Sequence, residues 1–224
     1  MNFICDICAM LKFEWLENTF WLSEKKAIFW EEENALILSD LHFGKSGHFR
    51  KSGIAVPQKL MQQDLMRLFD LIQFYKPSQL IIVGDLFHSD ANKEHDWFAR
   101  WRMDHPALPI HLVKGNHDIL NEQFYSNMLM VTSTELQLRN LRFLHHCDAG
   151  FIRNHPDYGI ITGHIHPAIV LARPGMKGLR LPCFHFSENC CTLPAFGSFT
   201  GTFPVKPKKQ DAVFVIGDTR VIRI

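Results

Sequence analysis

Three short stretches of the chain are apolar at almost every position, and each one ends in acidic, amide or imidazole side chains. They are residues 35–39 (ALILS), 80–83 (LIIV) and 110–113 (IHLV). A continuous apolar run of this length is typical of a strand in a parallel sheet that is covered on both faces. Between the first two runs, apolar residues recur at helical spacing over residues 57–75. This spacing predicts the helix that connects two parallel strands.

The rest of the chain extends this α/β pattern and then changes to strands. Further helices are predicted over residues 92–103 and near residues 119–126. Short apolar segments joined by turns predict strands over residues 20–22, 27–30, 128–138, 141–144, 159–162, 168–171, 179–186, 192–193, 212–216 and 219–224. We expect an α/β fold in which two packed sheets are flanked by helices, with residues 1–224 forming a single domain.

Composition excludes several classes of protein. The net charge of +1 gives no indication of a nucleic-acid-binding protein, although a local basic patch stays open. No apolar run approaches the roughly 20 residues of a membrane helix, and the N-terminus does not read as a signal peptide. A cytoplasmic protein without a membrane partner is therefore expected. Its six cysteines have no regular spacing, which favours free thiols.

Polar side chains follow five of the predicted strands. The five signatures are Asp40-Leu41-His42, Gly84-Asp85, Gly115-Asn116-His117-Asp118, His145-His146 and Gly163-His164-Ile165-His166. Ligand sites in open α/β sheets lie just beyond the carboxyl ends of strands. We therefore expect these carboxylates, amides and imidazoles to meet at one edge.

The spacing within the signatures suits a metal centre. In D-x-H and H-x-H, the two side chains point the same way because they are two apart on extended backbone. Asp85, on a short turn after glycine, can place one oxygen on each of two metals. Mixed oxygen and nitrogen ligands suit manganese, iron or zinc better than calcium. Two such cations about 3.5–4 Å apart can activate a bridging water and stabilise both oxygens of an in-line phosphoryl displacement.

Each residue also has a simpler interpretation. Asp40 could be a turn residue, His42 a core histidine, Asp85 a helix N-cap, and Asn116 a turn residue that tolerates left-handed backbone. These interpretations would have to hold together at five strand ends in this order. The series as a whole favours a metal centre.

The ordered series D-L-H, G-D-L-F-H, G-N-H-D, H-H and G-H-I-H over residues 36–166 resembles the calcineurin-like metallophosphoesterase superfamily. Further segments resemble its bacterial DNA-ligase-associated, DNA-damage-response endonuclease branch: S-D-L-H-F-G-K (39–45), F-R-K-S-G (49–53), V-P (56–57), L-P-C-F (181–184) and L-P-A-F-G-S-F-T-G (193–201). Residues 1–10 fall outside the resemblance and read as an extension. The resemblance implies a calcineurin-like four-layer sandwich.

The resemblance also implies a ligand set for two divalent metal ions, manganese first, with iron or zinc as alternatives. One metal would be held by Asp40, His42, Asp85 and His166, and the other by Asp85, Asn116, His145 and His164. Asp85 would bridge them. Only one of the adjacent His145 and His146 can be a ligand, and motif position favours His145.

Catalytic roles follow from the same resemblance. His117 would donate a proton to the leaving oxygen or stabilise the transition state, and Asp118 would orient His117 and keep it cationic. His88, in G-D-L-F-H, is expected near the substrate phosphate, although a solvent-facing loop histidine is the alternative.

Two segments beside these motifs lie near the expected rim of the site. Lys45 and Arg50 follow D-x-H directly and could hold a flanking phosphate, or could belong to a solvated basic loop. The family tail usually reads F-T-G-G, whereas this chain has Phe199-Thr200-Gly201-Thr202. We assign that tail no role.

The expected function is a metal-dependent phosphodiesterase, a DNA endonuclease of DNA repair that uses a metal-bridging hydroxide. One alternative is a phosphodiesterase or pyrophosphatase for a small nucleotide or lipid precursor. The other alternative is a non-catalytic scaffold, but such a protein should have lost ligands that this chain retains. Family analogy alone suggests a DNA ligase and a helicase as partners.

Overall fold

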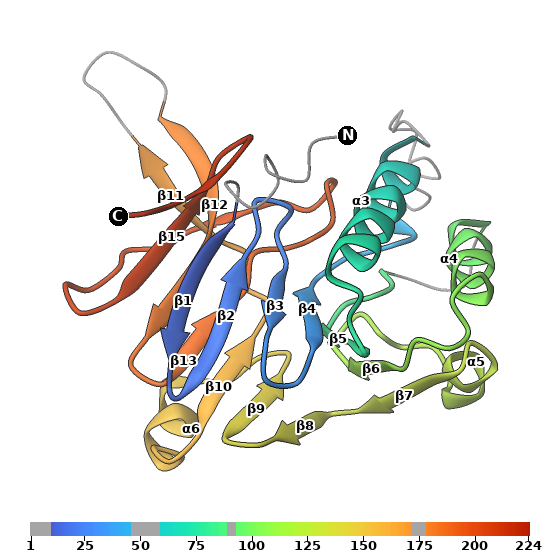
Figure 1. Cartoon of the computed structure of the whole chain (residues 1–224), viewed down its shortest axis with the longest axis horizontal. Helices are drawn as coiled ribbons and strands as arrows, with labels where there is room; N and C mark the ends of the chain where they lie inside the picture. Colours follow the sequence, from blue (N-terminus) through green and yellow to red (C-terminus); the bar gives the residue numbers. More distant parts are fainter. Residues whose placement is uncertain (1–9, 46–58, 89–92, 172–177) are drawn as a thin grey trace.

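The structure is a computed structural model that describes residues 10–45, 59–88, 93–171 and 178–224. Two mixed β-sheets pack against each other, and helices α3 (Lys59–Tyr75) and α4 (Lys93–Met103) lie beside the first sheet (Figure 1). The predicted fold class, two packed mixed sheets flanked by helices, is confirmed. Arg50, the second predicted substrate-binding residue, lies outside the described residues.

The first sheet has seven strands in sequence order. They are β1 (Leu11–Trp15), β2 (Asn18–Leu22), β3 (Ile28–Trp30), β4 (Ala35–Ser39), β5 (Gln79–Val83), β6 (Ile110–Val113) and β7 (Met130–Ser133). β1 to β4 pair antiparallel, whereas β4 to β7 pair parallel. The carboxyl ends of β4, β5 and β6 therefore meet at one edge.

The second sheet runs in the order β14 (Phe203–Pro204), β11 (Pro167–Leu171), β12 (Leu179–Ser187), β13 (Cys190–Thr192), β10 (Gly159–Thr162), β9 (Leu141–Leu144) and β8 (Glu135–Leu138). β15 (Ala212–Ile216) pairs with β12 and with β16 (Val221–Arg223). β9 and β10 pair parallel, so their carboxyl ends also lie side by side.

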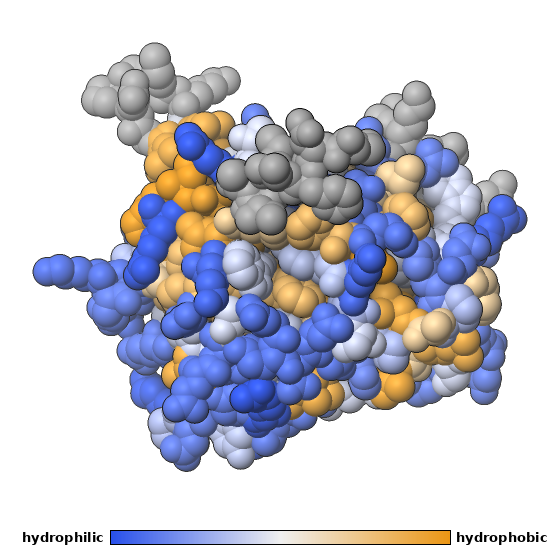
Figure 2. Space-filling view, viewed as in Figure 1, coloured by the Kyte–Doolittle hydropathy of each residue, from blue (hydrophilic) through white to orange (hydrophobic). Residues whose placement is uncertain are grey.

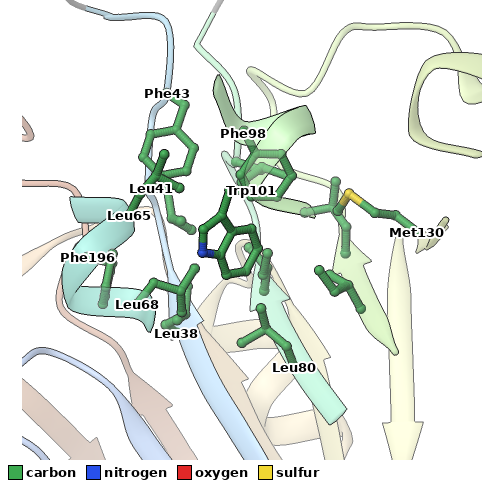
Figure 3. Close-up of a cluster of buried hydrophobic side chains, with 14 of the residues drawn as sticks. Leu38, Leu41, Phe43, Leu65, Leu68, Leu80, Phe98, Trp101, Met130 and Phe196 are labelled. Carbon is green, nitrogen blue, oxygen red and sulfur yellow. The ribbon is translucent and has the colours of Figure 1, made fainter. Parts of the chain in front are cut away.

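The apolar run of β4 is explained by two cores, one on each face. Leu36 and Leu38 belong to the core between the first sheet and the helices α3 (Lys59–Tyr75), α4 (Lys93–Met103) and α5 (Glu122–Asn127), part of which is drawn in Figure 3. Ala35 and Ile37 belong to the core between the two sheets. Both faces of this strand are therefore buried, as the sequence predicts.

Aromatic side chains dominate the core between the sheets. Phe20 and Trp30 from the first sheet are fully buried there with Phe143, Phe184 and Phe214 from the second. The rings of Trp30 and Phe143 lie 6.1 Å apart across the two sheets. This packing fixes the two sheets relative to each other, and so also the loops that leave their strands.

One predicted strand was wrong. Residues 128–138 form two strands, β7 and β8, which belong to different sheets because the chain crosses from one to the other near Thr134. The alternating strand β1, the edge strand β14 and the short helix α6 (Ala149–Asn154) were not predicted. Beyond α5 (Glu122–Asn127), α6 is the one helix among the described residues, so few helices cover the second sheet.

The surface and the thiols complete this description. Figure 2 shows apolar side chains gathered over β11 and β12, where Val170, Leu171 and Leu179 are exposed. Four cysteines have described positions and all are free, as predicted, whereas Cys5 and Cys8 lie outside the described residues. No helix in the described ranges combines the length and apolar character needed to cross a membrane.

Candidate metal centre

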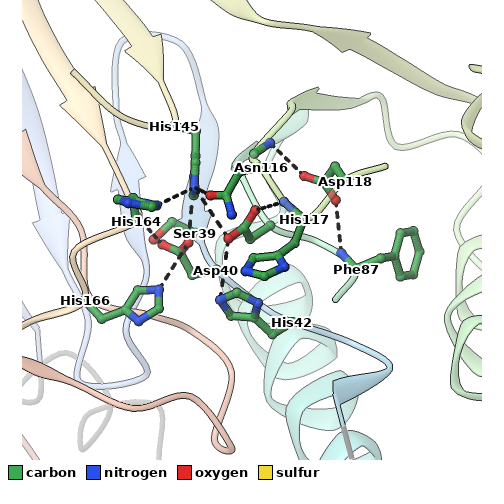
Figure 4. A network of polar contacts seen from close by, with 12 residues as sticks. Ser39, Asp40, His42, Phe87, Asn116, His117, Asp118, His145, His164 and His166 are labelled. Atoms are coloured by element: carbon green, nitrogen blue, oxygen red, sulfur yellow. Dashed lines mark hydrogen bonds and ion pairs between the residues drawn. The ribbon is translucent and has the colours of Figure 1, made fainter. Parts of the chain in front are cut away.

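Six of the seven predicted ligands form two groups at the shared edge of the sheets (Figure 4). One group is Asp40, His42 and His166, and the other is Asp85, His145 and His164. Within each group, one ligand atom from each residue lies within 4.8 Å of the others. The first sheet delivers the residues after β4 and β5, and the second sheet those after β9 and β10.

Left-handed backbone conformations set the direction in which most of these side chains point. Asp40, His42, Asp85, His164 and His166 all have positive φ, between 46° and 66°. A residue other than glycine adopts this conformation only when its surroundings impose it. Beyond the strand ends, the amides of Asp40 and His42 donate to the carbonyls of Gly84 and Asp85, at 3.1 and 2.9 Å. The two loops therefore hold each other in these bends.

Asp85 lies between the two groups, as a bridging ligand must. Its Oδ2 is 3.8 Å from Nε2 of His42 in the first group and 3.4 Å from Nε2 of His145 in the second. Its Oδ1 accepts a hydrogen bond from the backbone amide of His117 at 2.9 Å. The carboxylate is 2% exposed. It therefore faces both groups and also fixes the turn that carries His117.

The structure brings His145, not its neighbour His146, into the second group. His145 is buried, and its Nε2 lies 3.0 Å from Asn116 Oδ1 and 3.0 Å from His164 Nδ1. His146 is exposed and is not a member of the group, although its ring centroid lies 4.8 Å from that of His164. Asn116, the seventh predicted ligand, therefore contacts the second group directly.

Two imidazoles, those of His88 and His117, lie beside the first group. Their ring centroids are 4.4 Å apart, and they lie 5.4 and 5.5 Å from the ring centroid of His42. Burial lowers the pKa of His42 to about 2, and nearby Lys45 and the other histidines act in the same direction. His42 is therefore neutral, the protonation state that a metal ligand needs.

Within the described ranges, the Asp118 carboxylate contacts backbone amides and not the His117 ring, which was its predicted partner. Its Oδ1 accepts from the amide of Phe87 at 3.1 Å, and its Oδ2 accepts from the amide of Gly115 at 2.9 Å. Burial raises the pKa of this carboxyl to about 6, whereas those hydrogen bonds act to lower it. Among the described residues, the hydrogen bonds of this carboxylate go to loop amides and not to the His117 ring. Asp118 thus joins the loops after β5 and β6.

Lys45, which was predicted to lie at the rim of the site, is found beside His42 of the first group. It lines a small hollow together with His42, Phe43, Met61 and Phe199. Burial lowers the pKa of its ammonium group, whereas the Asp85 carboxylate acts in the opposite direction. Its charge is thus close enough to act on the metal centre.

The donors fit two divalent metal ions. Asp40 Oδ1, His42 Nε2 and His166 Nε2 are buried, and none of these atoms has a hydrogen-bond partner among the described residues. Buried polar atoms left in this way are costly unless a cation or another partner satisfies them. Carboxylate, amide and imidazole donors together suit a transition metal.

Sequence reasoning missed one part of the site. The loop of residues 194–201, which overlaps the tail 199–202 to which we assigned no role, runs directly beside the backbone of Asp40. It is held by Asp64 and Arg67 of α3, which no motif singled out. The signal was present, because this loop carries one of the segments on which the resemblance rests.

Comparison with known proteins found a family profile and solved structures to which this chain is similar. The family profile described as calcineurin-like phosphoesterase matches residues 34–144. A nuclease from Pseudomonas putida, called MPE, is 28% identical with a TM-score of 0.79, and the match covers 95% of this chain and 100% of that one. A phosphoesterase from E. coli is 13% identical with a TM-score of 0.41, covering 85% and 97% of the two chains. None of the curated proteins compared with this chain matched it.

Proposed function

The chain belongs to the calcineurin-like phosphoesterases, and from that premise we propose that it is a DNA endonuclease. One observation carries the proposal: the chain matches a Pseudomonas putida nuclease at 28% identity over nearly the whole length of both proteins. The family makes it a metal-dependent hydrolase of phosphoric esters. The choice of DNA as the ester, and a role in DNA repair, are our proposal.

Different residues of the chain would have different roles at the scissile phosphate. Asp40, His42 and His166 would hold one metal, and Asp85, Asn116, His145 and His164 would hold the other, with Asp85 shared between them. The ions, manganese first, would supply Lewis-acid stabilisation of the phosphoryl oxygens. The protein keeps its imidazole donors neutral by burial, as for His42.

His117 would supply the proton. Its backbone amide donates to Asp85 Oδ1, and its ring centroid lies 4.4 Å from that of His88 and 5.5 Å from that of His42. Water would release one proton to solvent as its oxygen forms the new P–O bond, and the leaving oxygen would depart with its electron pair and take a proton from the His117 ring, which solvent then reprotonates. His88 and Lys45 would contact the phosphate on either side.

The same premise supports two further parts of the proposal. Because ligands come from both sheets, residues 1–224 would act as a single catalytic domain, and neither sheet would retain the centre alone. A DNA substrate would place the protein in the cytoplasm. Cooperation with a DNA ligase and a helicase is proposed only by analogy with the family branch that the motifs of this chain resemble.

The test uses a circular single-stranded DNA and a linear duplex with a single-stranded gap, each incubated with the protein and Mn²⁺. A circle has no ends, so only an endonuclease cuts it. We expect wild type to linearise the circle, and we expect EDTA or His117→Ala to prevent cutting. His155→Ala, a histidine at the end of α6, is the matched control and should cut like wild type.

Other outcomes separate the alternatives. Hydrolysis of an aryl phosphodiester that EDTA abolishes, without any cutting of DNA, would refute the DNA substrate and favour a small nucleotide or a lipid precursor. Neither activity, in folded protein that binds no metal, would refute the enzyme and favour a scaffold.

A further inference from the structure

Residues 194–201, the tail loop, lie alongside the segment that carries Asp40. The amide of Phe196 donates to the carbonyl of Ser39 at 2.8 Å, and the amide of Gly197 donates to the carbonyl of Asp40 at 3.1 Å. The Ser39 hydroxyl donates back to the carbonyl of Pro194 at 3.2 Å. The loop therefore extends the pairing of β4 past its end, at the point where the backbone turns left-handed at Asp40.

The approach at Gly197 leaves no room for a side chain. A Cβ atom there would lie 2.3 Å from the carbonyl oxygen of Leu41, between the two ligands of the D-x-H segment. The tail loop is thus in direct backbone contact with this ligand turn.

The far end of the same loop reaches His166. The carbonyl of Gly201 lies 3.1 Å from Nδ1 of His166, and the amide of Phe203 donates to the carbonyl of His166 at 2.8 Å. A proton on Nδ1 donates to Gly201, which leaves the lone pair of Nε2 facing Asp40 Oδ1 at 3.3 Å. Such a hydrogen bond fixes the tautomer and the ring direction of a metal-ligating histidine.

A buried ion pair on helix α3 anchors the middle of the loop. Asp64 is 4% exposed and accepts from the amide and the hydroxyl of Ser198, at 2.9 and 2.6 Å. Arg67 pairs with Asp64 at 2.9 Å, donates to the carbonyl of Phe196, and lies over the Phe196 ring with 4.2 Å to its centroid. A carboxylate and a guanidinium therefore hold the loop from one side.

From these contacts we infer that the tail loop, anchored by Asp64 and Arg67, is a positioning element for one of the two metals. The hydrogen bonds described above reach the Asp40–His42–His166 group, at the backbone of Asp40 and at the ring of His166. Asp64 and Arg67 act through the loop and are positioning residues, not ligands. The inference rests on the two-metal centre proposed above.

The test measures each metal position separately. Wild type and Asp64→Asn are crystallised with limiting Mn²⁺, and anomalous scattering gives the occupancy of each position, while calorimetric titration gives the two affinities. Asparagine keeps the shape of the side chain but removes the charge that holds Arg67. We expect about tenfold weaker binding at the Asp40–His42–His166 position, within the range for residues that orient ligands, and unchanged binding at the other.

Two further variants keep the test decisive. Asp70→Asn is the matched control, because Asp70 lies on the same helix and forms an exposed ion pair with Lys25 at 3.5 Å. Ser198→Ala removes a single hydroxyl and should show a smaller loss at the same position, even if Asp64→Asn fails to fold. Unchanged binding at both positions, or an equal loss at both, would overturn the inference. Wild type without two bound metals would refute the metal centre itself.

Discussion

Replacing Gly84 with alanine should remove one metal position and leave the other. Gly84 has φ of +79°, and a Cβ atom built on it would lie 1.8 Å from Nδ1 of His145 and 2.5 Å from its Cγ. The imidazole cannot stay where it is. It would also lose its contacts with Asn116 Oδ1 and His164 Nδ1, each 3.0 Å from Nε2.

The magnitude follows from two separate penalties. Placing an alanine in left-handed backbone costs about 1–2 kcal/mol relative to glycine. Forcing extra volume into a packed site costs about 1–3 kcal/mol. We therefore expect the free energy of unfolding of the metal-free protein to fall by about 2–5 kcal/mol. With the ring displaced, the Asp85–His145–His164 group should bind its metal far more weakly, whereas the Asp40–His42–His166 group keeps its donors.

Urea unfolding of the chelated protein measures the stability, and elemental analysis after dialysis against Mn²⁺ measures the metal content. Gly217→Ala is the matched control, since the nearest atom to its added Cβ would be the Arg220 carbonyl oxygen at an ordinary 3.5 Å. That control should change stability by less than about 0.5 kcal/mol. A Gly84→Ala protein with wild-type stability and two tightly bound metals would refute the reasoning.

Three other changes test the centre. Asp85→Asn should abolish binding of the metal pair, because a neutral amide bridges two cations poorly, and elemental analysis showing two retained metals would contradict this. His117→Ala should keep both metals and lower turnover roughly 10²–10⁴-fold, so wild-type turnover would show that the leaving oxygen needs no proton from this ring. His42 has a pKa of about 2 when folded and 6.5 when unfolded, so the unfolded chain binds the extra proton as pH falls. The unfolding free energy of the metal-free protein should therefore drop by up to about 1.4 kcal/mol between pH 7.5 and 5.5, and His42→Gln should lack that part of the slope in urea unfolding.

The strands and the candidate ligands could be predicted from local sequence, because both are marked by residues that are close together in the chain. The apolar run of β4 reflects burial on both faces, and Asp40 and His42 follow it within three residues. The crossing from β7 to β8 left no such mark, because no glycine or proline separates the sequences MVTS and ELQL. Only the packing of the two sheets decides where this segment divides into two strands.

The contacts that hold the site in place could not be predicted from the sequence, for a different reason. The hydroxyl of Ser39 and the carbonyl of Pro194 are separated by 155 positions in the chain. The partners of Asp118 are backbone amides, which are present at nearly every residue and so give no sequence signal. Contacts of this kind depend on the assembled fold, whereas the ligand motifs depend on side-chain type.

At five of the predicted metal ligands, left-handed backbone favours glycine, whereas the predicted metal binding requires the side chain. Each of Asp40, His42, Asp85, His164 and His166 would be relieved of conformational strain if glycine replaced it. In a medium without metal, a screen for heat resistance would therefore tend to enrich glycine at these five positions, and every such survivor would have lost a ligand. Thermal selection of this enzyme should be carried out with metal present and with turnover as a second criterion.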